Sequence, residues 1–244
     1  MKTVIILAAG VGSRLRPITD ELPKSIVPVN GVPLLSRFLM QVKSSSVKTR
    51  VVVVAGYLSN QISDLVSGFQ ATTNSSIQVI VNKDYETTNN MESCRIALEA
   101  GDFGDCIIVN ADCIYDDQIV SQLVSFKGSC IAIDNSFYDE ESMKVIIKKN
   151  LVRSISKEFK NNDDVATSID LYKFDKITAQ DLFNIIEKYI DNNDINKWTE
   201  IAINDLLQKE EIEVKPFEIN GSRWYEIDTL EDLDKAEKLF LDEK

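Results

Sequence analysis

A short glycine-containing loop near the N-terminus holds the residues best suited to chemistry. Gly10 and Gly12 follow the apolar run 3–8, and Arg14 and Lys24 come next along the chain. Glycines let a backbone turn tightly and direct its N–H groups at an anion. Two cations beside such a loop, in an otherwise acidic chain, predict a site for a nucleoside triphosphate or a similar polyanion.

Two other phosphate-binding loops fail on spacing. A dinucleotide-binding loop needs G-x-G-x-x-G, but Leu15 occupies the position of the third glycine. A Walker A loop needs G-x-x-x-x-G-K-[ST], and no such run occurs in the sequence. A nicotinamide-dependent dehydrogenase and a P-loop enzyme are therefore both disfavoured.

The composition removes whole classes of chemistry. The 244 residues include no histidine, which excludes histidine-based triads, histidine-ligated zinc and imidazole acid–base catalysis. The four cysteines show no C-x-x-C spacing and lie in or beside apolar stretches, so we expect buried, reduced thiols. Carboxylates, lysine, arginine and hydroxyl groups remain to carry a reaction.

The charge balance and the hydrophobic patterning limit the partners. Thirty-nine acidic and 27 basic residues give a net charge of −12, which argues against nucleic acid as a partner. No stretch approaches the roughly 20 apolar residues that a membrane span needs. The apolar N-terminal run is too short for a signal peptide. We expect a cytoplasmic protein with no membrane partner.

The first half of the chain alternates apolar runs with amphipathic segments. We expect strands at 3–8, 50–55, 77–81 and 105–109, and helices at 33–43, 58–68 and 91–100. Near-continuous apolar strands separated by helices are typical of parallel strands that are covered on both faces. The pattern predicts an α/β fold, a Rossmann-like doubly wound and mostly parallel sheet that binds ligands beyond the carboxyl ends of its strands.

The second half has a different pattern. Strands are expected at 130–134, 143–149, 152–156 and 168–174, then helices at 178–191 and 197–209, then strands at 213–217 and 223–227. A last helix is expected to open at Thr229, with Asp232 three residues on as in a capping box. No linker interrupts the chain, so we expect residues 1–244 to form a single domain with a small β-rich acceptor lobe at about 129–174.

A longer string identifies a family. Residues 10–24 read G-x-G-x-R-L-x-P-x-T-x-x-x-P-K, which resembles the signature of the nucleotidylyltransferases, or pyrophosphorylases. The resemblance continues at Asn110-Ala111-Asp112 and in the segment 224–233. In that family one aspartate from each of these two segments holds the catalytic Mg²⁺. The resemblance therefore implies Asp112 and Asp228 as metal ligands, and Glu226 is a candidate for a further one.

A finer match narrows the branch. The segment 85–93, with Asn89-Asn90 and Ser93, is similar to the bacterial phosphocholine cytidylyltransferases and their phosphonate-using relatives. One segment departs from the pattern, because Ala166-Thr167-Ser168-Ile169-Asp170 stands where roughly Gly-Glu-x-Ile-Gly is expected. That segment lines the acceptor pocket in the family, so the departure bears on the identity of the acceptor.

The resemblance implies transfer of CMP from CTP to a small phosphorylated alcohol or amine, or to a phosphonate, with Mg²⁺ as cofactor. Arg14, Lys24 and Asp112 would be catalytic: Arg14 and the loop N–H groups hold the β- and γ-phosphates, and Lys24 neutralises the α-phosphate or the acceptor phosphate. An acceptor phosphate is already a competent nucleophile, so catalysis is mainly positioning and electrostatics. The nucleotide would be bound by Leu7, Ala8, Ala9, Gly10, Gly12, Ser13, Arg14, Lys24, Asn82, Asn89, Asn90 and Ser93.

Several alternatives stay open from the sequence. A sugar-1-phosphate nucleotidylyltransferase using UTP or dTTP would share the scaffold, and a non-catalytic nucleotide-binding regulator would share the loop. The three asparagines could form turns instead of contacting ligands. The aromatic residues Tyr115, Tyr138, Trp198 and Trp224 could be packing residues or a cation–π cage. The oligomeric state is left open, with a homodimer as the candidate assembly.

Overall fold

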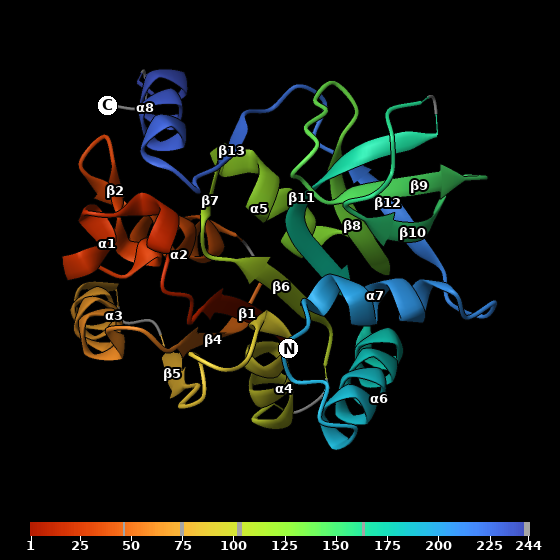
Figure 1. The fold of residues 1–244 in the computed structure, drawn as a ribbon, viewed down its shortest axis with the longest axis horizontal. Helices are drawn as coiled ribbons and strands as arrows, with labels where there is room; N and C mark the ends of the chain where they lie inside the picture. Colours follow the sequence, from red (N-terminus) through yellow and green to blue (C-terminus); the bar gives the residue numbers. More distant parts are fainter. Residues whose placement is uncertain (46, 74–75, 102–103, 163, 242–244) are drawn as a thin grey trace.

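A nine-stranded mixed sheet forms the centre of the molecule, described by a computed structural model for residues 1–45, 47–73, 76–101, 104–162 and 164–241 (Figure 1). Its main path runs β10-β9-β11-β6-β1-β4-β5. The parallel core is made of β1 (Lys2–Ala8), β4 (Thr49–Ala55), β5 (Ile77–Val81) and β6 (Cys106–Asn110). The four expected strands of the first half are thus confirmed as parallel neighbours, and the Rossmann-like prediction holds.

Side chains of the core strands alternate between two apolar layers. In β1, Val4, Ile6 and Ala8 face one hydrophobic cluster, whereas Ile5 and Leu7 face another. The first cluster is covered by α2 (Leu34–Ser44), α3 (Ser59–Thr73) and α5 (Asp117–Ser125). The second is covered by α4 (Asn90–Glu99), α6 (Lys176–Asp191) and α7 (Thr199–Leu207). A continuous Val/Ile/Leu run is the expected sequence of a strand buried in this way. The sequence pattern did not predict helix α5.

The strands of the β-rich segment join the same sheet and run antiparallel to its neighbours. They are β8 (Ser129–Asp134), β9 (Lys144–Lys148), β10 (Leu151–Ser156) and β11 (Val165–Phe174), and β12 (Val214–Glu218) adds to β8 in parallel. Strand β11 pairs with β9 through its first residues and with β6 through Leu171–Phe174. The expected strand at 168–174 therefore begins three residues earlier and connects the two parts of the sheet.

Small elements close the rim of the sheet. A two-stranded sheet pairs β7 (Cys113–Tyr115) with β13 (Trp224–Glu226), and a hairpin pairs β2 (Pro28–Val29) with β3 (Val32–Pro33). The segment after β1 contains the 3₁₀ turns η1 (Ser13–Leu15) and η2 (Lys24–Ile26) on either side of α1 (Ile18–Glu21). The last helix, α8 (Leu230–Leu239), lies beside β2 (Figure 1). The sequence predicted α8 and, with the strand expected at 223–227, also β13, whereas the other short elements have too little periodicity to be predicted.

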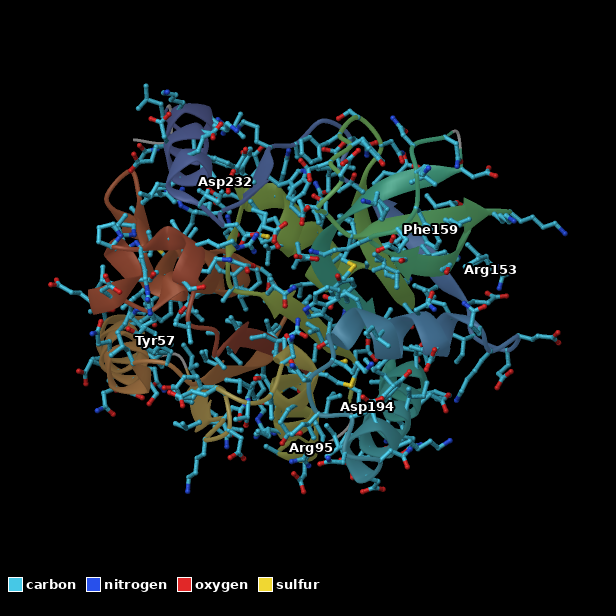
Figure 2. The ribbon with its side chains drawn as sticks, in the orientation of Figure 1. Tyr57, Arg95, Arg153, Phe159, Asp194 and Asp232 are labelled. Atoms are coloured by element: carbon cyan, nitrogen blue, oxygen red, sulfur yellow. The ribbon has the colours of Figure 1, made fainter. Side chains whose placement is uncertain are left out.

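The helices are held in place by packing and by a few ion pairs at their edges. Arg95 of α4 binds Glu92 and Glu99 on its own helix and Glu187 on α6, at the lower boundary of the two helices (Figure 2).

The four cysteines are buried and free, as predicted. Among the described residues, no helix combines the length and the apolarity that a membrane crossing requires.

Candidate active site

The glycine loop leaves β1 at the point where the strand order reverses. Gly12 has φ +66°, and a Cβ added there would lie 2.8 Å from Cβ of Lys24, so only glycine fits both the backbone and the space. Thr19 is buried and donates a 2.8 Å hydrogen bond to the Gly12 carbonyl. The loop is therefore packed directly on Lys24, and the predicted tight turn is present.

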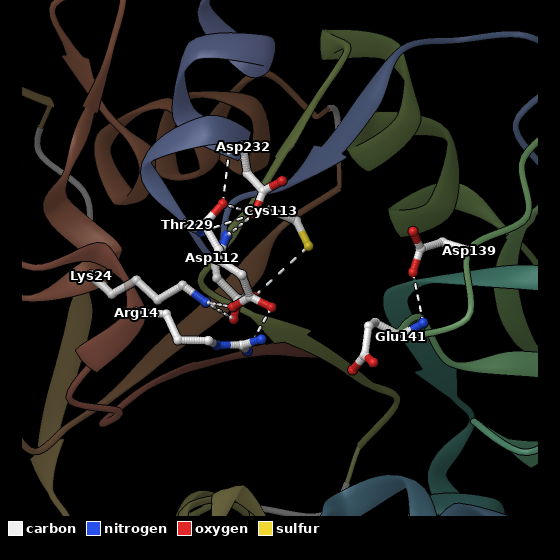
Figure 3. Close-up of polar contacts among 9 residues, drawn as sticks. Arg14, Lys24, Asp112, Cys113, Asp139, Glu141, Thr229 and Asp232 are labelled. Atoms are coloured by element: carbon white, nitrogen blue, oxygen red, sulfur yellow. Dashed lines mark hydrogen bonds and ion pairs between the residues drawn. The ribbon is translucent and has the colours of Figure 1, made fainter.

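Two cations and two carboxylates meet beside this loop (Figure 3). Lys24 Nζ lies 2.8 Å from Asp112 Oδ2 and 2.6 Å from Asp228 Oδ1. Arg14 Nη2 lies 2.7 Å from Asp228 Oδ2. Burial disfavours the charged form of Lys24, but the two carboxylates outweigh it and raise the pKa of the ammonium. The structure brings together the four charged residues that the sequence singled out from three distant segments.

Strand pairing explains why Asp112 and Asp228 meet. Asp112 lies between β6 and β7, and Asp228 follows β13. In the β7–β13 pair Cys113 stands opposite Glu226, and the Ile227 amide donates to the Asp112 carbonyl at 2.9 Å. Two chain reversals thus place residues that are 116 positions apart on the same rim.

A capping box fixes the backbone next to Asp228. The Thr229 side chain accepts from the Asp232 amide, and the Asp232 carboxylate accepts from the Thr229 amide at 2.8 Å and from the Asp228 amide at 3.3 Å (Figure 3). The predicted capping box is confirmed. It does more than begin helix α8, because it holds the main chain that carries Asp228.

The donor set suits a divalent cation. One carboxylate oxygen from each of Asp112, Glu226 and Asp228 lies within 4.8 Å of the others. Burial, followed by the charges of Asp170 and Asp112, raises the pKa of Glu226 to about 9, so burial and the neighbouring carboxylates together disfavour its charged form. Such hard oxygen ligands are those that Mg²⁺ and similar ions prefer. These three residues could therefore hold a metal ion, including the candidate Glu226.

A cleft of about 390 Å³ opens over the charged cluster. All but one of the predicted nucleotide-binding and metal-binding residues line it. The exception is Ala8, whose side chain faces the hydrophobic layer of α2 and α3. The predicted residues that line the cleft are Leu7, Ala9, Gly10, Gly12, Ser13, Arg14, Lys24, Asn82, Asn89, Asn90, Ser93, Asp112 and Asp228.

The Asn82 side chain is already engaged by its own surroundings. Its amide donates at 3.1 Å to both the Thr88 and the Ser93 hydroxyls, and its carbonyl oxygen accepts from the Asp84 amide. Asn82 is 1% exposed. Both amide donors that could read a base are thus used within the protein, and Thr88 and Ser93, which accept from them, are residues that line the cleft.

The Asn89-Asn90 pair connects the start of α4 to the start of α7. Asn89 caps α4 by accepting from the Asn90 amide at 2.8 Å, and the Asn90 carbonyl oxygen accepts from the Thr199 amide at 2.8 Å. The Asn90 amide also donates to Asn110 at 3.3 Å. Both residues therefore have structural partners as well as a position on the cleft, so the turn-forming alternative describes part of what they do.

Sequence reasoning identified only part of the acceptor side of the cleft, because it associated the segment 166–170 with the acceptor pocket but did not single out Glu200. Asp170 of β11 and Glu200 of α7 both line it and are 8% and 4% exposed. The Tyr172 hydroxyl lies between them, 2.9 Å from Asp170 Oδ1 and 3.1 Å from Glu200 Oε1. Burial and the charge of Glu200 raise the pKa of Asp170 to about 7, and burial raises the pKa of Glu200. Glu200 carries no sequence signal, because an acidic residue in the first turn of a helix is common.

The residues at 166–170 that depart from the family pattern have two different roles. Thr167 is buried outside the lining of the cleft and donates a 2.6 Å hydrogen bond to the Phe137 carbonyl. Lys144 is fully buried and donates to the carbonyls of Asp139 and Glu140. These bonds hold the loop in which Asp139 accepts from the Glu141 amide, and Glu141 lines the cleft (Figure 3). Thr167 therefore shapes the cleft from behind, whereas Asp170 faces it.

One of the four aromatic candidates lines the cleft. This residue is Trp198, and the Nζ atom of Lys157 lies 5.1 Å from the centre of the Trp198 ring. Lys157 also lines the cleft. Trp224 instead donates to Asp134 at 2.9 Å, and the Tyr115 hydroxyl donates to the Ile169 carbonyl. Tyr138 packs against Lys144. The packing alternative thus describes Trp224, Tyr115 and Tyr138.

Comparisons with known proteins identify the family of the chain. The family model described as nucleotidyl transferase matches residues 3–134. A bifunctional IPC transferase and DIPP synthase of Aquifex aeolicus is 26% identical over 240 residues, which cover 98% of this chain and 51% of that protein. A 2-aminoethylphosphonate cytidylyltransferase of Lancefieldella rimae is 31% identical over 118 residues, 48% of this chain and 46% of that protein. The matches span about half the length of these relatives.

Solved structures extend the likeness to the whole fold. A CTP:phosphocholine cytidylyltransferase from Streptococcus pneumoniae superposes with a TM-score of 0.81 at 22% identity, covering 98% of this chain and 99% of that one. A structure described as a putative glucose-1-phosphate thymidylyltransferase from Bacillus anthracis also gives 0.81, at 20% identity, covering 99% of this chain and 96% of that one. At this identity the likeness establishes the fold and does not separate the two activities.

Proposed function

The chain belongs to the nucleotidyl transferase family, and on that premise we propose that it transfers CMP from CTP to a small acceptor bearing a phosphate or phosphonate, releasing pyrophosphate. The observation that carries the proposal is the double ion pair of Lys24 with Asp112 and Asp228, extended by Arg14. It joins the three elements that nucleotidyl transfer requires, namely a phosphate loop, fixed cations and a metal-binding pair of carboxylates.

In the structure, the ammonium of Lys24 and the guanidinium of Arg14 form ion pairs with carboxylates. A bound triphosphate offers these cations a second anion, so Arg14 would turn to the β- and γ-phosphates and Lys24 to the α-phosphate. Mg²⁺ on Asp112 and Asp228 would supply charge neutralisation at the α-phosphoryl group. Glu226 would be available to the same ion, because its carboxylate lies within 4.8 Å of those of Asp112 and Asp228.

The reaction needs no general base from this chain. An acceptor phosphate is anionic near neutral pH and can attack directly, and the sequence contains no histidine to assist it. The barrier lies in bringing two polyanions together, so preorganised cations are the main catalytic device. Lys24 suits this role, because its packing under Gly12 and its two carboxylate partners fix the ammonium in place.

Support for CTP and for a small acceptor comes from the relatives and from the cleft. The Lancefieldella protein is named as a cytidylyltransferase of a small phosphonate, and the segment 85–93 resembles that branch. Tyr85, Thr88 and Ser93 from this segment line the cleft.

We also propose that the chain acts as a single domain whose residues 129–174 form the acceptor side, because Asp170 and Glu141 both line the cleft from there.

Pyrophosphate release across a grid of substrates tests the proposal. The purified chain would be assayed with CTP, UTP, ATP and dTTP against small phosphorylated alcohols and amines, a phosphonate and hexose 1-phosphates, with Mg²⁺. Turnover should be fastest for CTP with a small acceptor. Faster turnover of glucose 1-phosphate with UTP or dTTP would assign the sugar-nucleotide reaction instead. Nucleotide binding without turnover of any acceptor would favour a regulator.

A further inference from the structure

Two buried carboxylates at one end of the cleft lack a cationic partner. Neither Asp170 nor Glu200 forms an ion pair with a lysine or arginine among the residues that the structure describes, although both are more than nine-tenths buried. Asp112 and Asp228, in the same cleft, are both paired; an Asp170 oxygen lies within 4.8 Å of the Asp112 carboxylate, whereas among the described residues Glu200 belongs to no such group. A buried carboxylate without a counter-charge is costly, so the pair points to a positively charged group supplied from outside the chain.

The hydrogen-bond donors around this pair carry no positive charge. The Tyr172 hydroxyl carries a single proton but lies 2.9 Å from Asp170 Oδ1 and 3.1 Å from Glu200 Oε1. It can therefore satisfy only one of the two carboxylates at a time. The other donors are amides: Asn110 donates to Glu200 at 3.4 Å and also to Asp170, and Asn90 and the Glu200 backbone N–H donate to Glu200. Because all of these donors are neutral, the pair still lacks the counter-charge that a ligand with several charged N–H donors would bring.

The backbone at Asp170 directs its carboxylate into this position. Asp170 has φ +57°, and the register of β11 against β8 shifts between Ser168 and Tyr172. Glycine would adopt this conformation with no penalty, and the family resemblance leads one to expect glycine here. The chain instead places an ionisable side chain at a left-handed bulge facing the cleft, which conformational preference alone does not explain.

Building on the proposed cytidylyl transfer, we propose that Asp170 and Glu200 bind a protonated primary amine of the acceptor and thereby select aminoalkyl phosphates or phosphonates over trimethylammonium acceptors. A primary ammonium offers three N–H donors, which match the oxygens of Asp170, Glu200 and Tyr172. A trimethylammonium group has no N–H donor, and aromatic faces suit it better. The aromatic ring that Trp198 adds to the cleft already stacks with Lys157.

The acceptor pair phosphoethanolamine and phosphocholine tests this directly, because the two differ only in three N-methyl groups. With CTP and Mg²⁺, the wild-type kcat/KM should be at least tenfold higher for phosphoethanolamine. The variant Asp170→Asn keeps the size of the side chain and tolerates a positive φ. It should lower kcat/KM for phosphoethanolamine at least tenfold, mainly through KM, while the KM for CTP changes less than twofold.

Matched controls separate recognition from charge and from folding. Glu158→Gln removes one negative charge from an exposed position outside the cleft, and it should leave the preference between the two acceptors unchanged. The Tm of Asp170→Asn should equal or exceed that of the wild type, because the substitution relieves repulsion between two buried carboxylates. Calorimetric binding of CDP-ethanolamine and CDP-choline gives a second readout that needs no turnover, and CDP-ethanolamine should bind more tightly.

Each result leads to one conclusion. Equal or better use of phosphocholine, equal binding of the two products, or an equal effect of Asp170→Asn on both acceptors would overturn the amine assignment and leave cytidylyl transfer intact. Failure of CTP to react with every small acceptor, with turnover of hexose 1-phosphate and UTP, would overturn the proposed function and the amine assignment with it.

Discussion

The phosphate end and the acceptor end of the cleft handle buried charge in opposite ways, although they adjoin where carboxylate oxygens of Asp112 and Asp170 lie within 4.8 Å of each other. At the phosphate end, Lys24 and Arg14 neutralise Asp112 and Asp228, so each of these carboxylates has a cationic partner within the chain. At the acceptor end, Asp170 and Glu200 share one tyrosine proton and have no cation among the described residues. The cations of the phosphate end are held in place by the chain, which suits a ligand that is the same in every turnover, the triphosphate. The carboxylates of the acceptor end have no such partner, so their negative charge would be neutralised by a cationic acceptor.

Loss of either aspartate at the phosphate end should give the largest effect. Asp112→Asn or Asp228→Asn removes one anionic metal ligand, and we expect kcat to fall by at least about a hundredfold through lost electrostatic stabilisation of the transition state. The measurement is the steady-state rate at saturating Mg²⁺, with circular dichroism to verify the fold. Near-normal turnover in either variant would overturn the assignment of that aspartate as a metal ligand.

Loss of either cation should come next. Lys24→Ala and Arg14→Ala should each cost about 2–4 kcal/mol of transition-state stabilisation, roughly 30- to 1,000-fold in kcat/KM, as for loss of an oxyanion-binding donor. Arg16→Ala is a matched control, because Arg16 lies in the same loop but pairs with Asp20. An effect below about threefold at Lys24 or Arg14 would mean that the loop binds something other than the triphosphate.

Loss of the Tyr172 hydroxyl, which contacts both carboxylates of the acceptor end, should have a moderate effect on stability. Tyr172→Phe leaves Asp170 and Glu200 without their common donor, so we expect the free energy of unfolding to fall by about 1–3 kcal/mol. Urea titration measures this, and the KM for CTP should change little, because the Tyr172 hydroxyl bonds Ser168, Asp170 and Glu200 and not the cations proposed to bind the triphosphate. A large rise in the KM for CTP would contradict the separation of the two ends.

The capping box should give the smallest effect. Asp232→Ala removes the carboxylate that accepts from the Thr229 and Asp228 amides, and loss of a cap typically costs about 1 kcal/mol. Thermal unfolding would show the loss, with a severalfold drop in activity at most, because the Lys24 ion pair still holds Asp228. Asp234→Ala on the same helix, which has a surface pair with Lys238, serves as the control and should change neither quantity.

The sequence by itself determined the phosphate end. The glycine loop, Arg14 and Lys24 lie within 15 residues of one another, so spacing alone reveals a polyanion site, and the apolar runs reveal the strands that carry it. The metal pair followed from the family resemblance. Local patterns were sufficient here, because a tight turn and a buried strand are set by neighbouring residues.

Only the tertiary structure decided the acceptor end. Asp170 comes from a bulged strand, Tyr172 from the same strand two residues later and Glu200 from the first turn of α7, and no local pattern links them. The same holds for Asn82, whose amide is used within the protein, and for Thr167, which supports a loop. Side chains from distant segments share one environment only after the sheet has paired β11 with β6 and packed α7 against it. Their burial, and therefore the energetics of their charges, is a property of that packing.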